Sequence, residues 1–162
     1  MRVAIGFDHA GFPLKQAILS ELEQGGHEVI DCGTDSDESV DYPVHAARAA
    51  TSVSLGEAEA AVIACGSGGG VSIVANKFPG VRAINAHDVE DAEMARRHND
   101  ANTLALAGRR LSEIEAREVV HAFLTTPFEG GRHKRRVDQI TELEERSVLE
   151  LRRERQLKEA KR

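Results

Sequence analysis

The sequence predicts an α/β protein, a three-layer sandwich in which a five-stranded parallel sheet lies between helices, as in Rossmann-like folds. Short apolar runs alternate along the chain with segments whose apolar residues recur at helical spacing. The central run, residues 60–64, is uniformly apolar and short, which is typical of a strand buried on both faces. Strands that alternate with helices in this way build a parallel sheet with helices on both faces.

The strands are predicted wherever an apolar run of strand length occurs between two helical segments. The first run follows Met1 directly, and the third leads into a glycine-rich loop. The last run ends at Gly108 and Arg109. The predicted strands are residues 2–7, 27–32, 60–64, 81–86 and 103–107.

The helices between these strands have recognisable starts and stops. Pro13 suits a first helical turn, and the helix that follows it carries an apolar stripe and stops at two glycines. Tyr42 opens an alanine-rich helix that ends near residue 56. Ser112, with Glu115 three residues later, forms a capping box for a helix that runs to about residue 124. Two further helices are predicted over residues 71–77 and 89–98.

Composition limits the classes of protein to which this chain can belong. Its 162 residues suit one domain, and the lack of Trp with only one Tyr predicts an aliphatic core. A net charge of −6 argues against nucleic acid as the main partner. No apolar run approaches the roughly 20 residues that span a bilayer, and no signal-peptide pattern is present, so we expect a cytoplasmic protein without a membrane partner.

The most informative stretch is the glycine-rich loop after the third strand. Cys65 ends that strand, and four glycines occur within the next five residues. Unpaired amide groups at such a loop and the start of the following helix favour an anion. We interpret the stretch as an active site in which Cys65 moves a proton and the loop holds developing negative charge. Two alternatives remain open at this point, because Cys65 also suits a buried core and the loop also suits a nucleotide. Val71 breaks the dinucleotide fingerprint, however, and no Walker lysine follows.

Other polar residues follow the ends of neighbouring strands. Asp8 and His9 come directly after the first strand, and Arg109 comes after the last. Because ligands bind beyond the carboxyl ends of parallel strands, we expect these residues to lie along one edge with Cys65 and its loop. Asp8 and His9 also suit the simpler roles of turn former and capping or core histidine.

Two polar clusters lie later in the chain. Arg132 and Arg136, four residues apart, share one helical face, where two guanidinium groups suit a phosphate dianion. A solvated helix start explains the same basic run equally well. His98, next to Asn99 at a helix end, is either a cation placed favourably at the helix dipole or an acid–base group. The histidines and the two cysteines lack metal-ligand spacing, so no metal is expected.

Five motifs in order resemble ribose-5-phosphate isomerase of type B, in the family that also contains galactose-6-phosphate isomerase subunits. The resemblance extends from residue 1 to about residue 145. The motifs are GFDHAGFPLK, VDYP, CGSGGGVSIVANKFPGVRA, RRHNDANTLALAGRR and FEGGRHKRRV. The resemblance implies an aldose–ketose isomerase that interconverts ribose 5-phosphate and ribulose 5-phosphate through an enediolate, without a metal or organic cofactor. It also implies a homodimer, or a dimer of dimers, with active sites shared between subunits.

The resemblance also implies roles for individual residues. Cys65 stands where one branch of the family has its proton-abstracting cysteine, and Val71 stands where the other branch has a glutamate. His98 is the residue that opens the sugar ring, and Ser67 keeps the hydroxyl residue of the catalytic loop. Gly69 departs from a position that often carries a larger apolar residue. The implied substrate-binding residues are Asp8, His9, Tyr42, Gly66, Ser67, Gly68, Gly69, Gly70, Asn99, Arg109, Arg132 and Arg136.

The chain continues beyond the part that resembles the family. We therefore expect an isomerase domain over residues 1–145 and a charged helical extension over residues 146–162, with its far end projecting. The charged segment from residue 132 onward is expected to dock one apolar stripe against a neighbouring element, with Val137, Ile140, Leu143, Val148 and Leu151 as its members. The preferred sugar stays open, since a phosphate of a four- or six-carbon sugar is an alternative to ribose 5-phosphate. A non-catalytic phosphate-binding module and an interaction protein that uses the charged end are alternatives of other classes.

Overall fold

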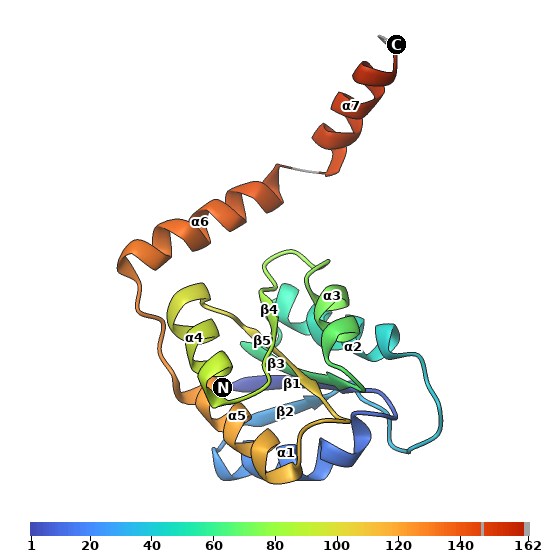
Figure 1. Ribbon diagram of the computed structural model, residues 1–162, viewed down its shortest axis with the longest axis vertical. Coiled ribbons are helices and arrows are strands. Elements are labelled where there is room, and N and C mark those ends of the chain that lie inside the picture. The colour runs from blue at the N-terminus through green and yellow to red at the C-terminus, as the bar shows by residue number, and fades with distance from the viewer. Residues whose placement is uncertain (147, 161–162) are drawn as a thin grey trace.

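A five-stranded parallel sheet forms the centre of the protein, as predicted (Figure 1). The computed structural model describes residues 1–146 and 148–160. Its strands follow the order β2-β1-β3-β5-β4, and every neighbouring pair runs parallel. The strands are β1 (Arg2–Phe7), β2 (Glu28–Asp31), β3 (Ala60–Cys65), β4 (Ala83–Asn85) and β5 (Thr103–Ala107).

Helices cover both faces of the sheet, which confirms the three-layer prediction (Figure 1). One face packs against α1 (Lys15–Gln24), α4 (Val89–Asn99) and α5 (Glu113–Thr125), and the other packs against α2 (Tyr42–Ser54) and α3 (Gly69–Ala75). Alternate residues of each strand point to the two faces, so each buried strand contributes to both cores. The core strand residues are Val3, Ile5, Phe7, Ala60, Val62, Ala64, Leu104 and Leu106 on the first face and Ala4, Ala61, Ile63, Cys65 and Ala105 on the second.

The α2 face is packed with small residues, in agreement with a chain that has few aromatics. Ala46, Ala49 and Ala50 are fully buried there. Gly6 of β1 faces the same helix, and a Cβ atom at this position would lie 2.6 Å from the His45 carbonyl oxygen. The helix backbone therefore approaches the sheet closely, which fixes where the first turn of α2, with Tyr42, lies.

Most predicted elements are confirmed, with shifts at their ends. The first helix begins with a 3-10 turn, Phe12–Leu14, and β4 is shorter than the predicted 81–86. The helix after the glycine loop begins at Gly69 rather than residue 71, because Gly68 caps it with a left-handed backbone (φ 74°). The capping box of α5 is confirmed, since Ser112 and Glu115 each bond the other's backbone amide.

The C-terminal part of the chain forms two helices, α6 (Gly131–Glu145) and α7 (Val148–Glu159). We predicted an apolar stripe docked against a neighbour, and this is wrong for most of its members. Val137 is buried, whereas Ile140, Leu143 and Leu151 are 46%, 65% and 66% exposed, and the side chain of Val148 lies outside the described residues. The reason is that α6 packs on α4 only near its start, and further along Ile140 and Leu143 line an open groove beside α4 and β4. Near the end of α6, Glu144 Oε2 accepts a hydrogen bond of 2.8 Å from the Gly80 amide, and α7 then projects away from the body (Figure 1). The division at residue 145 stays a prediction.

Across residues 1–146 and 148–160, no helix has both the length and the apolar character that a membrane span requires.

A buried lysine holds the long loop that joins β2 to α2. Lys15 Nζ donates to the Thr34 carbonyl oxygen at 2.8 Å and to Asp35 Oδ1 at 2.9 Å, and it lies 2.7 Å from Asp31 Oδ2. Burial acts to lower the pKa of Lys15, but the bonds to Asp31 and Asp35 outweigh it and raise the pKa above its ordinary 10.5. The lysine thus stabilises the loop as a cation.

Replacing Lys15 by methionine tests this tether. At neutral pH we expect Lys15→Met to lower the free energy of unfolding by on the order of 1 kcal/mol, because charge-assisted hydrogen bonds are lost. A raised pKa contributes stability that is present below 10.5 and disappears as the pH rises through the folded-state value. Urea denaturation of both proteins should therefore show the difference shrinking above pH 10.5. The exposed Lys77→Met serves as the control, and a difference that stays constant with pH would contradict the tether.

Candidate active site

The residues singled out in the sequence fall into two groups in the folded chain. The first, which we call the carboxyl-edge group, lies where β1, β3 and β5 end, and the second lies at the end of α4 and the start of α6. The carboxyl-edge group contains Asp8, His9, Tyr42, Cys65, Gly66, Ser67, Gly68, Gly69, Gly70 and Arg109. The second group contains His98, Asn99, Arg132 and Arg136.

Cys65 is the last residue of β3 and pairs with Ala107, the last residue of β5. Its carbonyl oxygen accepts a hydrogen bond of 2.8 Å from the Gly108 amide. The residue is 5% exposed and belongs to the core beneath α2 and α3. A cysteine that only packs in the core would be equally buried, so burial does not distinguish a catalytic role from a structural one. The catalytic interpretation of Cys65 therefore depends on the groups that surround the loop after it.

The glycine loop has its conformation fixed by Asn85, at the end of β4. Asn85 Nδ2 donates to the Ser67 carbonyl oxygen at 3.1 Å. A Cβ atom added to Gly68 would overlap Asn85 Oδ1, an atom that is buried and has no hydrogen-bond partner among the described residues. Sequence reasoning missed Asn85, although an asparagine at the end of a predicted strand was the signal that could have identified it.

Tyr42 and Arg109 both lie against the glycine loop. A Cβ atom at Gly70 would fall 2.7–2.8 Å from the Tyr42 ring, and one at Gly66 would fall 3.3 Å from the Arg109 side chain. Gly69 is different, because the nearest heavy atom to its Cβ position is Ser67 Oγ at 3.6 Å. A larger residue therefore has room at 69, and the glycine there is not required by packing.

Asp8 and His9 form a tight turn beside this loop. Asp8 Oδ1 accepts hydrogen bonds of 2.9 Å from the amides of both Ala10 and Gly11, which satisfies one carboxylate oxygen within the turn. His9 Nδ1 lies 3.2 Å from the backbone N and O of Val40, so Nε2 is the ring nitrogen that remains for a ligand. The turn packs closely on the ends of β3 and β5, since Gly11 faces the backbone of Ala64 and Gly108 faces the Ala10 carbonyl oxygen.

The second group lies at the opposite edge of the sheet. The helix α4 runs back between the parallel strands β4 and β5, so His98 and Asn99 lie near the amino end of β5, at Thr103. Cys65 pairs with Ala107, four residue steps further along β5, and at roughly 3.3 Å per residue this amounts to about 13 Å along the strand. The structure of a single chain therefore does not bring His98 and Cys65 into one pocket.

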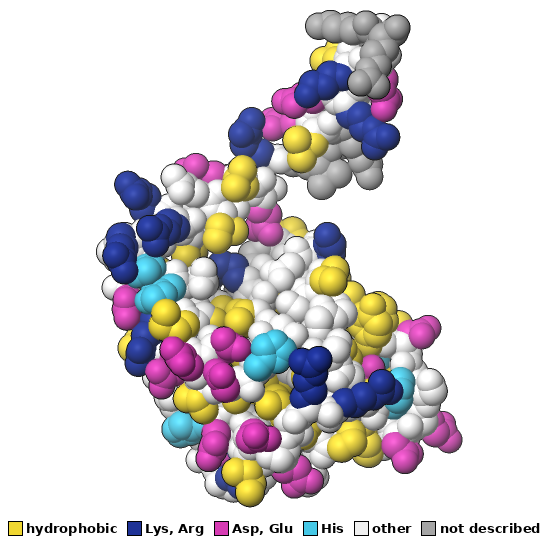
Figure 2. Space-filling model, viewed as in Figure 1, with side chains coloured by type: hydrophobic (Ala, Val, Ile, Leu, Met, Phe, Trp, Pro, Cys, Tyr) yellow, Lys and Arg dark blue, Asp and Glu magenta, His cyan; other side chains and the backbone are white. Residues whose placement is uncertain are grey.

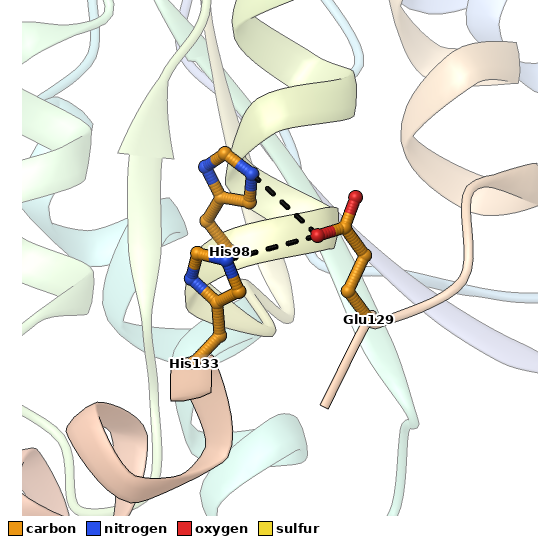
Figure 3. Close-up of side chains that lie close together, drawn as sticks. All are labelled: His98, Glu129 and His133. Atoms are coloured by element: carbon orange, nitrogen blue, oxygen red, sulfur yellow. Dashed lines mark ion pairs between the residues drawn. The ribbon is translucent and has the colours of Figure 1, made fainter. Parts of the chain in front are cut away.

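His98 has two partners that the sequence did not predict (Figure 3). Its ring stacks on His133 with centroids 4.2 Å apart and planes 1° apart. Glu129 Oε2 lies 3.8 Å from His98 Nε2 and 3.7 Å from His133 Nε2. Burial, together with the neighbouring His98 and Arg132 side chains, lowers the pKa of His133 below its ordinary 6.5. The signal that was missed is that His133 and the buried Val137 are four residues apart and share the inner face of α6.

Arg132 and Arg136 lie on the exposed side of α6, one turn apart, as their spacing predicted. Figure 2 shows Lys and Arg side chains gathered over the start of α6, beside histidine. Between α4, β4 and α6 lies a groove of about 860 Å³ whose lining includes His98, Asn99 and the exposed apolar residues Met94, Ile140 and Leu143. Basic residues and an apolar groove thus adjoin His98.

The fold and these groups place the chain in the class of parallel α/β proteins that have a polar site at the carboxyl edge of their strands. Within that class, the chain belongs to the ribose/galactose isomerase family, whose model matches residues 3–140. It is 44% identical over 145 residues to ribose-5-phosphate isomerase B of Escherichia coli, covering 90% of this chain and 97% of the relative.

Solved structures of relatives agree with this assignment. The ribose-5-phosphate isomerase B of Clostridium thermocellum superposes with a TM-score of 0.87 at 44% identity, covering 90% of this chain and 99% of the other. The enzyme of Mycoplasma genitalium, solved with bound ribulose 5-phosphate, has a TM-score of 0.86 at 36% identity and covers 90% and 97% of the two chains.

Replacing Gly68 by alanine tests the support that Asn85 gives the loop. Gly68 has φ 74° and Gly26 has φ 68°, but a Cβ atom would meet Asn85 at the first position and nothing within 4 Å at the second. We expect Gly26→Ala to lower the free energy of unfolding by about 1 kcal/mol from backbone strain alone, and Gly68→Ala to lower it by roughly 2–4 kcal/mol. Urea denaturation of the two variants measures the difference. Equal losses would show that Asn85 does not hold the loop.

Proposed function

We propose that this protein interconverts D-ribose 5-phosphate and D-ribulose 5-phosphate. Membership of the ribose/galactose isomerase family supports the reaction class, and relatives about 44% identical over nearly their whole length are named ribose-5-phosphate isomerase B. The observation that carries the proposal is local: Cys65 opens a glycine loop against which Tyr42 and Arg109 lie, at the edge where parallel α/β sheets bind ligands.

The reaction moves one proton between two neighbouring carbons. Cys65, as the thiolate, removes the proton from the carbon beside the carbonyl, and the electrons of that C–H bond form an enediolate. The thiol then returns the proton to the adjacent carbon, while a proton moves between the two oxygens. Backbone amides from Ser67 to Gly70 would stabilise the enediolate oxygen, a contribution of about 3–4 kcal/mol for each well-placed donor. These steps use no metal or organic cofactor.

The remaining residues prepare and hold the linear sugar phosphate. His98 would exchange a proton with the ring oxygen to open the sugar, and Asp8 would help to orient it. Asn99 and Tyr42 would bind the sugar hydroxyls. The cationic side chains suit the phosphate and would fix the reacting carbons against Cys65. The phosphate-binding set is His9, Arg109, Arg132 and Arg136.

We infer that the active site is completed by a second copy of the chain, in a homodimer or a dimer of dimers. His98 and Asn99 lie at the opposite sheet edge from Cys65, so one chain cannot present both sides to the same small sugar. The apolar groove along α6, with Met94, Ile140 and Leu143 exposed, is a surface that a partner chain would cover. A metabolic reaction on a phosphorylated sugar also agrees with a cytoplasmic location.

A second candidate reaction is isomerisation of another sugar phosphate, of four or six carbons. The family description, which includes galactose, favours it, and the unfilled space at Gly69 would admit a sugar of different length. Comparing kcat/KM for aldose phosphates of four, five and six carbons decides between them. We expect ribose 5-phosphate to give the largest value, and a larger value for a six-carbon substrate would favour the second reaction.

Replacing Cys65 by serine tests the proposed base. We expect Cys65→Ser to fold normally and to lose at least about 10³-fold in kcat for ribose 5-phosphate, because a hydroxyl is far less acidic than a thiol. Cys32→Ser, at the other cysteine, should keep activity close to that of the parent. For the parent and both variants, an isomerisation assay measures kcat and circular dichroism checks that each protein is folded. Near-full activity in Cys65→Ser would remove Cys65 from the role of base.

A further inference from the structure

Three metal-ligating side chains converge where α4 meets the start of α6, and two of them have no part in the proposed reaction. His98 comes from the last turn of α4, His133 from the first turn of α6, and Glu129 from the loop that precedes α6. Their donor atoms all lie within 4.8 Å of one another, and both Nε2 atoms face the same Glu129 carboxylate oxygen (Figure 3).

We propose that His98, Glu129 and His133 bind a divalent transition-metal ion of borderline softness, such as Zn²⁺, and that the bound ion inhibits the enzyme. Two imidazole nitrogens and one carboxylate oxygen are a donor set that zinc accepts, with further coordination positions left for water. The proposed reaction itself uses no metal, so the ion would act as a regulator rather than as a cofactor.

Two of the three distances between donor atoms are close to those that coordination requires, and the third, between the two histidines, is at most 4.8 Å. Ligand atoms that lie about 2.1 Å from one tetrahedral zinc are roughly 3.4 Å from each other. The Glu129 oxygen is 3.8 Å and 3.7 Å from the two imidazole nitrogens, so a contraction of a few tenths of an ångström suffices for these pairs. The parallel rings must also tilt for their lone pairs to converge. His98 and Glu129 can adjust, because their side chains are 30% and 50% exposed.

The backbone already holds the ligands near these positions. The Glu129 amide donates to the Arg97 carbonyl oxygen at 3.1 Å, which ties the loop to the last turn of α4. Glu129 and His133 are four residues apart across the start of α6, whose Gly130 carbonyl accepts from the His133 amide at 3.0 Å. Binding would therefore order side chains more than backbone, which limits its entropic cost.

Arg132 affects the proposed metal site in two opposite ways. Its Nε donates to His133 Nε2 at 3.3 Å, so this nitrogen presents a lone pair, as a metal ligand must. An ion would displace that contact, and Arg132 is exposed and can turn away. The guanidinium groups of Arg132 and Arg136 repel a cation, which Glu129 only partly offsets. We therefore expect micromolar rather than nanomolar affinity for Zn²⁺.

Binding is tested without reference to catalysis. Zinc chloride is titrated by calorimetry into protein freed of metal with a chelator, using the parent, Glu129→Gln and His133→Gln. His121→Gln is the matched control, because His121 faces a single carboxylate, Glu21, at 3.0 Å. We expect a dissociation constant of about 10 μM or tighter for the parent and His121→Gln. Both site variants, shown to be folded by circular dichroism, should bind at least tenfold more weakly. Parent affinity no better than millimolar, or equal affinity in all four proteins, would overturn the proposal.

Inhibition depends on the proposed role of His98 and is measured separately. Because zinc would occupy His98 Nε2, isomerisation of ribose 5-phosphate should fall with the same zinc dependence as the calorimetric binding and return when chelator is added. For the Glu129→Gln variant, the zinc concentration that halves its own metal-free rate should be at least tenfold higher than for the parent protein. Saturable binding with an unchanged rate would overturn the inhibitory part alone. A parent protein with no isomerase activity would refute the proposed function. The calorimetric titration alone would then decide whether the metal site exists.

Discussion

A helix that joins two parallel strands must run back across the sheet, and this constraint determines how the candidate site is built. Cys65 lies where β3 ends, whereas His98 and Asn99 lie where α4 has returned to the start of β5. Stacking of His133 on His98 then places the start of α6, with Arg132, at the same edge. The groups proposed for proton abstraction and for ring opening are thus kept apart within each chain.

Close packing of small residues shapes the carboxyl edge. Gly11 and Gly108 allow the turn after β1 to touch the ends of β3 and β5, and Gly68 fits against Asn85. Tyr42 reaches the loop because α2 lies close to the sheet over Gly6, and because Lys15 restrains the chain that leads into α2. The aliphatic, alanine-rich core that the composition indicates is therefore also the reason why several loops meet in a small space.

Local patterns in the sequence predicted most of the fold. Apolar runs, the capping box at Ser112 and the glycine loop after residue 64 each depend on neighbouring residues, and the structure confirms the elements they predicted. What sequence reasoning missed depends on contacts between distant segments. Asn85 supports Ser67 across 18 residues, and Glu129 faces His98 from another element, so no local spacing reveals either contact. Ile140 and Leu143 have the spacing of a docked stripe, but they line an open groove between α6 and the body and stay exposed.

The central claim is that one chain supplies Cys65 and its partner supplies His98. Subunit mixing tests it most directly, using Cys65→Ser and His98→Asn proteins that are each inactive alone and are unfolded and refolded together. In an equal mixture, half of the dimers that form are hybrids with one chain of each variant. If sites are shared between chains, each hybrid has one intact site and one site that carries both changes. Activity should then recover to about a quarter of the parent value. If hybrid dimers form, as native mass spectrometry would show, and activity stays at the level of the separate variants, the account is contradicted.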